Sequence, residues 1–327
     1  MNRPAHEDTD PPELLEALSR RLGRSHARQR LGIEDEKDRQ VLGGGLNFLH
    51  LEHSSTAAAV LRGLLRVSGL YGRGRRNALA LQLRENEVFL PRLPDPFDGL
   101  RILHLSDLHL DMNPDALPAL IEQVRAIDYD LCVLTGDYRA RTFGSVQAAV
   151  EGMRRLRLHL ADPVYAVLGN HDSVRMVPAF EDMGIRLLLN EAVPLERDGS
   201  VLHLAGVDDG HFFRVDNIEK AADPVPDGEP AILLSHTPEL YRQAAHAGFD
   251  FFLCGHTHGG QICLPGGVPV ILEAKIPRRL GSGAWSHGPM QGYTSRGAGT
   301  SVVDVRFNCP GEITVHRLRR GAGRAPQ

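Results

Sequence analysis

Five apolar stretches of the sequence each end in a short cluster of aspartate, asparagine or histidine residues. The clusters are "LSDLH" at 105–109, "LTGD" at 134–137, "VLGNHD" at 167–172, "LLSH" at 233–236 and "CGHTH" at 254–258. The apolar stretches have the character of buried strands, and helix-like segments lie between them, which predicts an α/β domain. In such folds, side chains that follow the strands converge at one edge of the sheet, where ligands bind. The pattern therefore predicts both a fold class and the position of a site.

Each cluster taken alone has an ordinary structural explanation. An aspartate such as Asp137 directly after a strand can cap a helix or a turn, and His236 could be a hydrogen-bonded core histidine. The pair His256 and His258 is the most specific, because alternate residues of an extended turn point the same way and the flanking glycines let the backbone approach a cation. Five such clusters at five strand ends are improbable by chance. We therefore predict that they form one shared metal site.

The candidate ligands supply two carboxylates, one amide and four imidazoles, and no thiolate. They are Asp107, His109, Asp137, Asn170, His236, His256 and His258. This set exceeds the four ligands of a tetrahedral zinc. Mixed nitrogen and oxygen donors suit two divalent ions such as Mn²⁺, Fe²⁺ or Zn²⁺ that share a bridging carboxylate. Two such ions keep a net positive charge beside two carboxylates, so the site would attract an anion and could clamp a phosphoryl group.

Composition narrows the classes of protein to which the chain can belong. The net charge of −4 over 327 residues gives no global reason to expect nucleic acid or an anionic membrane as a partner. Four cysteines without C-x-x-C spacing, at positions 132, 254, 263 and 309, predict buried thiols and a reducing compartment. The sequence contains neither a secretory signal nor an apolar run long enough to span a membrane. We therefore expect a cytoplasmic location.

The chain divides into three parts that differ in composition and in the pattern of apolar residues. Residues 1–85 form an N-terminal extension that we expect to be partly disordered and partly helical, with a short helix around Leu14–Leu22 in a mobile tail. Residues 86–318 form the main domain, and residues 319–327 form a disordered tail. Turn residues at Glu85-Asn86 predict a hairpin that leads into a strand at Arg101–Leu105. Alternating runs predict two late strands, in "TSVVDVRF" and "EITVHRL".

The segment from Val60 to Arg76 combines apolar residues on roughly one helical face with several arginines. One interpretation is an amphipathic helix that rests on an anionic membrane surface. The other, which we favour, is a helix that packs on the main domain with its arginines in solvent. Peripheral membrane contact therefore stays an open possibility for this segment.

At the five clusters the chain resembles the calcineurin-like metallophosphoesterase superfamily, whose signature runs D-x-H, GD, GNH[DE], H and GHxH. Every element is present in order between Asp107 and His258. The "GDY" form, "GHTHGGQICLP" and "GYTSRGAGTSVVDVRFNCPGEIT" are similar to one bacterial branch, which includes stand-alone phosphodiesterases and enzymes that cleave the pyrophosphate of UDP-diacylglucosamine. The resemblance covers about residues 93–318. It implies a four-layer α-β-β-α sandwich of two mixed sheets flanked by helices, preceded by the N-terminal helical extension.

The resemblance also implies a role for each residue of the clusters. One metal would be held by Asp107, His109, Asp137 and His258, and the second by Asp137, Asn170, His236 and His256. The nucleophile would be a hydroxide that bridges the metals. His171 would protonate the leaving oxygen or stabilise charge in the transition state, and Asp172 would orient the His171 imidazole.

One position departs from the family pattern and leaves the substrate contacts open. Many members carry an acidic residue or an arginine three positions after the GD aspartate, where this chain has Ala140. Arg139, Arg141 and Arg296 could each reach a substrate phosphate or lie solvated beside the cleft, so no substrate-binding residue is assigned.

The leading functional interpretation is hydrolysis of a phosphodiester or pyrophosphate bond by two metals, on a substrate that could be lipid-linked or contain a nucleotide. The alternatives that use the same site are a nuclease and a phosphomonoesterase. A non-catalytic scaffold is the third class, and it is disfavoured because no ligand of the signature is missing. The sequence does not indicate an oligomeric state.

Overall fold

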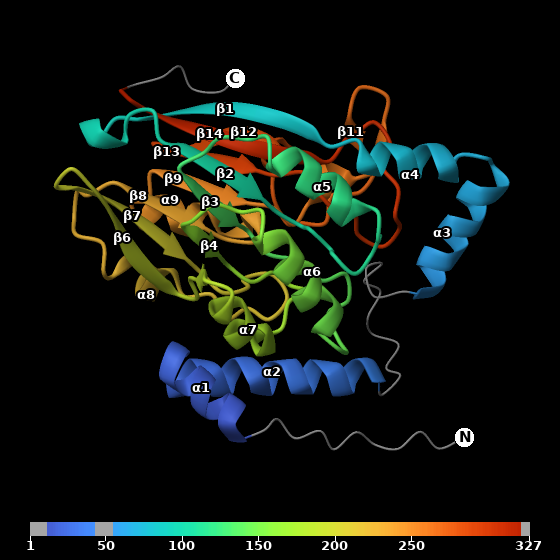
Figure 1. The fold of residues 1–327 in the computed structure, drawn as a ribbon, viewed down its shortest axis with the longest axis horizontal. Coiled ribbons are helices and arrows are strands. Elements are labelled where there is room, and N and C mark those ends of the chain that lie inside the picture. The colour runs from blue at the N-terminus through green and yellow to red at the C-terminus, as the bar shows by residue number, and fades with distance from the viewer. Residues whose placement is uncertain (1–11, 43–54, 322–327) are drawn as a thin grey trace.

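The protein consists of two six-stranded mixed sheets that pack face to face, with helices on both outer faces (Figure 1). The computed structural model describes residues 12–42 and 55–321. In one sheet the strand order is β1 (Gln82–Leu90), β14 (Glu312–Arg320), β2 (Arg101–Leu105), β3 (Leu131–Leu134), β4 (Val164–Ala166) and β5 (Ile185–Leu187). In the other it is β12 (Gly283–His287), β13 (Met290–Thr294), β9 (Phe251–Cys254), β8 (Ala231–Leu234), β7 (Ser200–Gly206) and β6 (Glu191–Arg197). A short hairpin, β10 (Cys263–Leu264) and β11 (Val268–Pro269), lies outside both sheets.

The helices of the main domain form the two outer layers. On the first sheet lie α5 (Ala116–Val124), α6 (Gln147–Arg157) and α7 (Val177–Asp182), and on the second lie α8 (Ile218–Ala222) and α9 (Tyr241–His246). The described part of the N-terminal extension contributes α1 (Pro12–Leu22), α2 (Arg24–Leu42), α3 (Ser55–Val67) and α4 (Tyr71–Leu79). None of these helices, within the described ranges, has the length and apolarity needed to cross a membrane.

Alternation along the buried strands explains why the sheets stack in layers. In β2, Ile102 faces the core between the sheets, whereas Leu103 and Leu105 face the helices. In β8, Ile232 likewise faces the intersheet core and Leu233 faces the opposite helical layer. Successive side chains of a strand point to opposite faces, so a strand that is apolar throughout must be covered on both sides. The expected four-layer α-β-β-α sandwich of two mixed sheets is confirmed.

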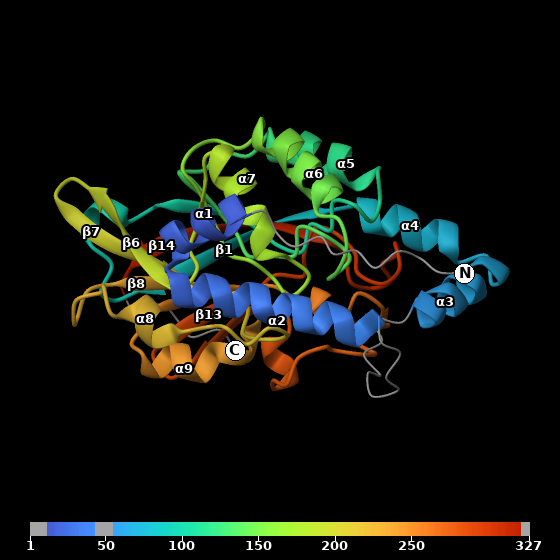
Figure 2. The same cartoon turned by 90° about the horizontal axis from the view of Figure 1, so that it is seen from below.

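The N-terminal extension differs from the expected short helix in a mobile tail. Helices α1 and α2 pack against the main domain, and Leu18, Leu22, Ala27 and Leu31 are buried in the same core as α5–α7. Seen from below, α2 lies across the molecule between α7 and the α8–α9 side (Figure 2). The burial of these four side chains gives α1 and α2 a fixed position on the domain. Residues 1–11 and 43–54 of the expected extension lie outside the described residues.

Two further strand predictions were wrong. Glu85 and Asn86 do not form a turn, because both lie inside β1, which pairs in parallel with β14 along its whole length. The partner of β1 is thus the last strand of the chain, which is too distant in sequence for a local turn signal to reveal. The segment "TSVVDVRF" forms irregular backbone with a single bridge between Ile262 and Phe307. The predicted strand "EITVHRL" lies within β14, which also contains Arg319 and Arg320, the first two residues of the expected disordered tail. Residues 322–327 of that tail lie outside the described residues.

Candidate metal centre

The backbone bends sharply at the ends of the strands that carry the predicted ligands. Five of these residues have a positive φ: Asp107 (52°), His109 (41°), Asp137 (58°), His256 (72°) and His258 (51°). The left-handed region is sparsely populated by residues other than glycine, and each such residue costs about 1–3 kcal/mol. Strain concentrated at one edge of the two sheets is a mark of function, because the surrounding structure must compensate for it.

Glycines beside the ligands allow the loops to approach one another closely. A Cβ atom on Gly255 would overlap Ser106 and the carboxylate of Asp107, and one on Gly169 would overlap the carboxylate of Asp137. Only a residue without a side chain fits at these two positions. The glycines of the "CGHTH" and "VLGNHD" clusters therefore allow ligands from both sheets to meet.

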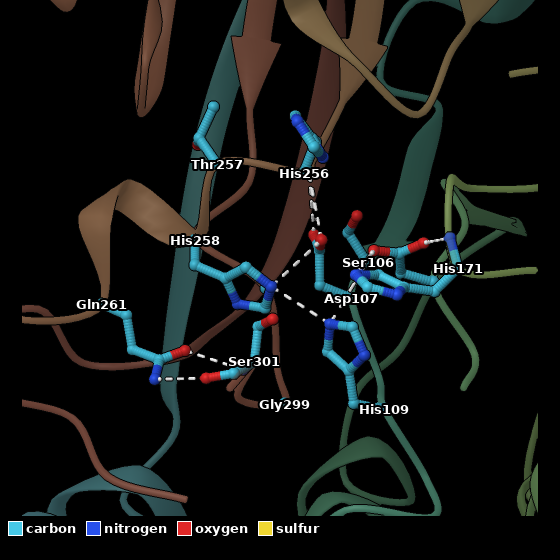
Figure 3. Close-up of polar contacts among 12 residues, drawn as sticks. Ser106, Asp107, His109, His171, His256, Thr257, His258, Gln261, Gly299 and Ser301 are labelled. Atoms are coloured by element: carbon cyan, nitrogen blue, oxygen red, sulfur yellow. Dashed lines mark hydrogen bonds and ion pairs between the residues drawn. The ribbon is translucent and has the colours of Figure 1, made fainter. Parts of the chain in front are cut away.

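Asp107, His109 and His258 form the first group of donors (Figure 3). The Nε2 atoms of His109 and His258 lie 3.1 Å apart, and Nε2 of His258 lies 3.5 Å from Oδ1 of Asp107. One ligand atom from each of the three residues lies within 4.8 Å of the other two. All three residues are buried. This group could hold one metal ion.

Asp137, His236 and His256 form the second group, which also lies within 4.8 Å and is also buried. Nε2 of His236 lies 3.2 Å from Oδ2 of Asp137 and 2.9 Å from Oδ1 of Asn170. The same Oδ2 atom of Asp137 lies 3.9 Å from Nε2 of His109 in the first group. The structure thus brings all seven predicted ligands together, with Asp137 between the two groups.

The hydrogen bonds of the imidazoles fit a metal centre. His109 donates from Nδ1 to the carbonyl oxygen of Arg139 (2.8 Å), and His236 donates from Nδ1 to that of Thr135 (2.7 Å). Such a bond fixes the tautomer and leaves the Nε2 lone pair for a metal. Nε2 of His256 is buried and has no hydrogen-bond partner among the described residues. A buried polar atom without a partner requires an explanation, and a bound cation supplies one.

The pKa shifts of His256 and His258 fit the same conclusion. The pKa of His236 differs, because burial alone would lower it but the carboxylates of Asp137 and Asp107 raise it to about 10. Burial, together with neighbouring positive charge, lowers the pKa of His256 and of His258 well below its usual value. Both imidazoles are therefore neutral, which is the form that binds metals. Burial alone would raise the pKa of Asp137, but the nearby His236 and His171 hold it well below its usual range.

The expected pairing of Asp172 with the His171 imidazole differs from the bonds in the structure. The carboxylate of Asp172 accepts backbone N–H groups of Asp137 (2.7 Å), Tyr138 (2.9 Å) and Gly169 (2.8 Å), so it joins the "LTGD" and "VLGNHD" loops. Nδ1 of His171 lies 2.8 Å from Oγ1 of Thr142. Buried backbone N–H groups need hydrogen-bond acceptors, so the Asp172 carboxylate accepts from them rather than from the His171 imidazole. Thr142 was missed because a lone threonine in a loop carries no signal of such a contact.

Replacing Thr142 by valine should lower kcat for phosphodiester hydrolysis by about tenfold to a hundredfold, because the His171 ring would lose a partner that fixes its orientation. KM and bound metal should change little, since Thr142 contacts neither donor group. Steady-state kinetics with metal analysis checks this expectation. Thr142→Ser keeps the hydroxyl and should restore the rate. A serine variant as slow as the valine variant would show that the side chain acts only through packing.

The three candidate substrate arginines differ in position. Arg139 is buried, its Nη2 donates to the carbonyl oxygen of Gly144, and burial lowers its pKa. Arg141 is exposed, and Arg296 lies 3.7 Å from the carboxylate of Glu312. The loop that Arg139 supports also accepts the hydrogen bond of His109, through the Arg139 carbonyl oxygen.

Comparison with known proteins gives a consistent family. Residues 100–260 match the sequence model of the calcineurin-like phosphoesterase family. The metallophosphoesterase YkoQ of Bacillus subtilis is 30% identical over 229 residues, which cover 67% of this chain and 83% of YkoQ. The phosphodiesterase YaeI of Escherichia coli is 30% identical over 255 residues, or 72% and 87% of the two chains. A transmembrane protein with a metallophosphoesterase domain from Danio rerio is 29% identical over 251 residues, or 70% and 55%. The chain therefore belongs to the calcineurin-like phosphoesterase family and is a metal-dependent phosphoesterase.

Proposed function

We propose that the protein hydrolyses a phosphodiester or pyrophosphate bond at a centre of two divalent ions, Mn²⁺, Fe²⁺ or Zn²⁺. The observation that carries this proposal is the position of Asp137, whose Oδ2 atom lies 3.2 Å from His236 and 3.9 Å from His109. A carboxylate placed between two donor groups suits a bridging role. The coordination of one ion would be completed by Asp107, His109 and His258. That of the other ion would be completed by Asn170, His236 and His256.

The residues around the centre would divide the work of the reaction. When bound, the ions supply a water-derived nucleophile near neutral pH and stabilise charge on the phosphoryl oxygens. Nε2 of His171 lies 4.0 Å from Oδ2 of Asp137, at the edge of the donor groups. From this position His171 would donate a proton to the leaving oxygen, while Thr142 holds the opposite ring nitrogen. Asp172 would keep the two loops in register through its backbone contacts.

The name of YaeI, a phosphodiesterase, supports a diester over a monoester as substrate. The net charge of −4 gives no support to a polynucleotide substrate. A cytoplasmic location stays a prediction, and the burial of all four cysteines agrees with it. An oligomeric state is not assigned.

Removal of metal should abolish the hydrolysis of bis-p-nitrophenyl phosphate, and re-addition of Mn²⁺, Fe²⁺ or Zn²⁺ should restore it. Elemental analysis of the restored protein should find two ions per chain. His171→Ala should lower kcat by about 10²–10⁴-fold with its metal content unchanged, because the general acid is lost but no ligand is.

Parallel assays with p-nitrophenyl phosphate and with a nucleotide sugar separate the substrate classes. Faster turnover of the monoester would replace the proposed diesterase by a phosphomonoesterase. Full activity after chelation, or a His171→Ala protein with wild-type kcat, would contradict the proposed mechanism. Absence of turnover on all three substrates by metal-loaded protein would favour the scaffold.

A further inference from the structure

Exposed apolar side chains gather in two segments of the molecule. In the described residues, eight of the ten large apolar side chains that are exposed belong to these segments. Val60, Leu64, Val67 and Leu70 lie in α3 or directly after it, and Leu264, Val268, Val270 and Ile271 lie in the β10–β11 hairpin and the residues beside it. We call these eight residues the apolar rim. Figure 1 shows that α3 projects from the end of the sandwich rather than covering a sheet.

A groove lies between α3 and the residues beside the β10–β11 hairpin, and it reaches two of the predicted metal ligands. Leu61 of α3 lines this groove together with Val270 and Ile271, and His256 and His258 also line it. Its volume is about 350 Å³, within the range of ligand-binding sites. The lining therefore combines apolar side chains with two predicted metal ligands, and it includes one carboxylate, that of Glu273. This combination suits a substrate with an apolar tail and a phosphoryl head.

The charge that α3 and α4 place beside the apolar rim is positive, although Arg62 and Arg75 pair with Asp304 and Asp115. Residues 55–79, which form α3 and α4, contain five arginines and no acidic residue, although the whole chain has a net charge of −4. Arg66, Arg73 and Arg76 are exposed, and so are Arg278 and Arg279, which follow Val270 and Ile271 in the sequence. Exposed arginines next to exposed aliphatic side chains are typical of a surface that rests on anionic lipid, since each group then contacts the chemistry it prefers.

We propose that the apolar rim docks on an anionic lipid surface and that the groove receives the acyl part of an amphiphilic phosphoester, whose phosphoryl group then reaches the metal centre. The choice of substrate rests on the proposed function, whereas the docking does not. A lipid surface explains three features together: the apolar rim, its arginine border, and the continuity of the groove with the metal ligands. A protein partner would require none of these to coincide with the entrance to the site.

Co-sedimentation with vesicles tests the docking. The metal-loaded protein should sediment with vesicles of mixed phosphatidylcholine and phosphatidylglycerol, and far less with pure phosphatidylcholine. The double variant Leu64→Glu and Val67→Glu should bind the mixed vesicles at least about tenfold more weakly, because each glutamate replaces an apolar contact and repels the anionic surface. Leu158→Glu is the matched control, since Leu158 is 80% exposed but lies on the α6 side, outside the apolar rim. It should bind like the wild type.

The same variants separate the two proposals. The double variant should still hydrolyse soluble bis-p-nitrophenyl phosphate at the wild-type rate, but should lose turnover of a vesicle-borne phospholipid diester. The docking proposal would be overturned if the wild-type protein did not bind mixed vesicles, or if Leu158→Glu lost as much binding as the double variant. Neither result would contradict the proposed phosphoester hydrolysis. A wild-type dimer that the double variant abolishes, without vesicle binding, would identify a second copy as the occupant and also overturn the docking proposal. Vesicle binding without any hydrolysis would instead refute the proposed function.

Discussion

Replacing Asp137 by asparagine should lower the turnover of a phosphodiester by about a thousandfold or more and reduce bound metal to at most one ion per chain. The expected loss is about 4 kcal/mol of transition-state stabilisation, which is the scale of a metal's contribution to stabilising developing charge. Asp137 lies between the two donor groups, at 3.2 Å from His236 and 3.9 Å from His109. An amide of the same size is neutral and is a poor bridge between two cations.

A second effect of Asp137→Asn acts through the backbone. Oδ1 of Asp137 accepts the N–H of His171 at 2.9 Å, and this bond helps to place the proposed general acid. Asp111→Asn is the matched control, because Asp111 accepts the backbone N–H of Ala140 in the same loop but is exposed. The control should keep two ions and nearly the full rate. If the Asp137→Asn protein also kept two ions and nearly the full rate, Asp137 would not be the bridging ligand, and the proposed dinuclear centre would be contradicted.

The positions of the metal ligands could be predicted from the sequence because their signals are local. A short apolar run followed by a polar cluster marks the end of a buried strand, and parallel strands end at a common edge. His256 and His258 were identified in this way, and they lie beside His236 and His109 as the fold requires. The contact between Thr142 and His171 could not be predicted, because only the tertiary fold brings these two residues together.

The role of the N-terminal helices was harder to predict for a different reason. Helix α2 is rich in charged residues, which ordinarily indicate a solvated surface. Two of those charges, on Arg30 and Glu34, are in fact buried. Arg30 and Glu34 pair with each other one turn apart, but the further partners that allow both charges to be buried are far away in sequence. They are Asp208 for Arg30, and Ser173, Val174 and Arg175 for Glu34. A composition-based reading therefore favours a mobile tail where the structure has a docked helix.

Arg30→Ala should destabilise the protein by about 3–5 kcal/mol, because the buried carboxylates of Glu34 and Asp208 each lose one of their two basic partners. Arg30 is fully buried, and its guanidinium lies 3.0 Å from Glu34 and 3.4 Å from Asp208. Its Nη2 also donates to the carbonyl oxygen of Asp172 at 3.0 Å, beside the proposed general acid. Urea unfolding measures the loss. Arg28→Ala, on the exposed side of the same helix, is the matched control and should change stability by less than about 0.5 kcal/mol.

The pH dependence gives an independent check on Arg30. Burial alone would raise the pKa of Asp208, but Arg30 and the hydrogen bond from His26 outweigh burial, and the pKa lies below its usual value. A carboxyl with a lowered pKa in the folded state stabilises the protein above about pH 4, its ordinary pKa, and this stabilisation disappears as the pH falls further. The wild type should therefore lose more stability than Arg30→Ala between neutral pH and pH values below about 4. Parallel stability curves for the two proteins would mean that Arg30 contributes packing but no charge interaction with Asp208.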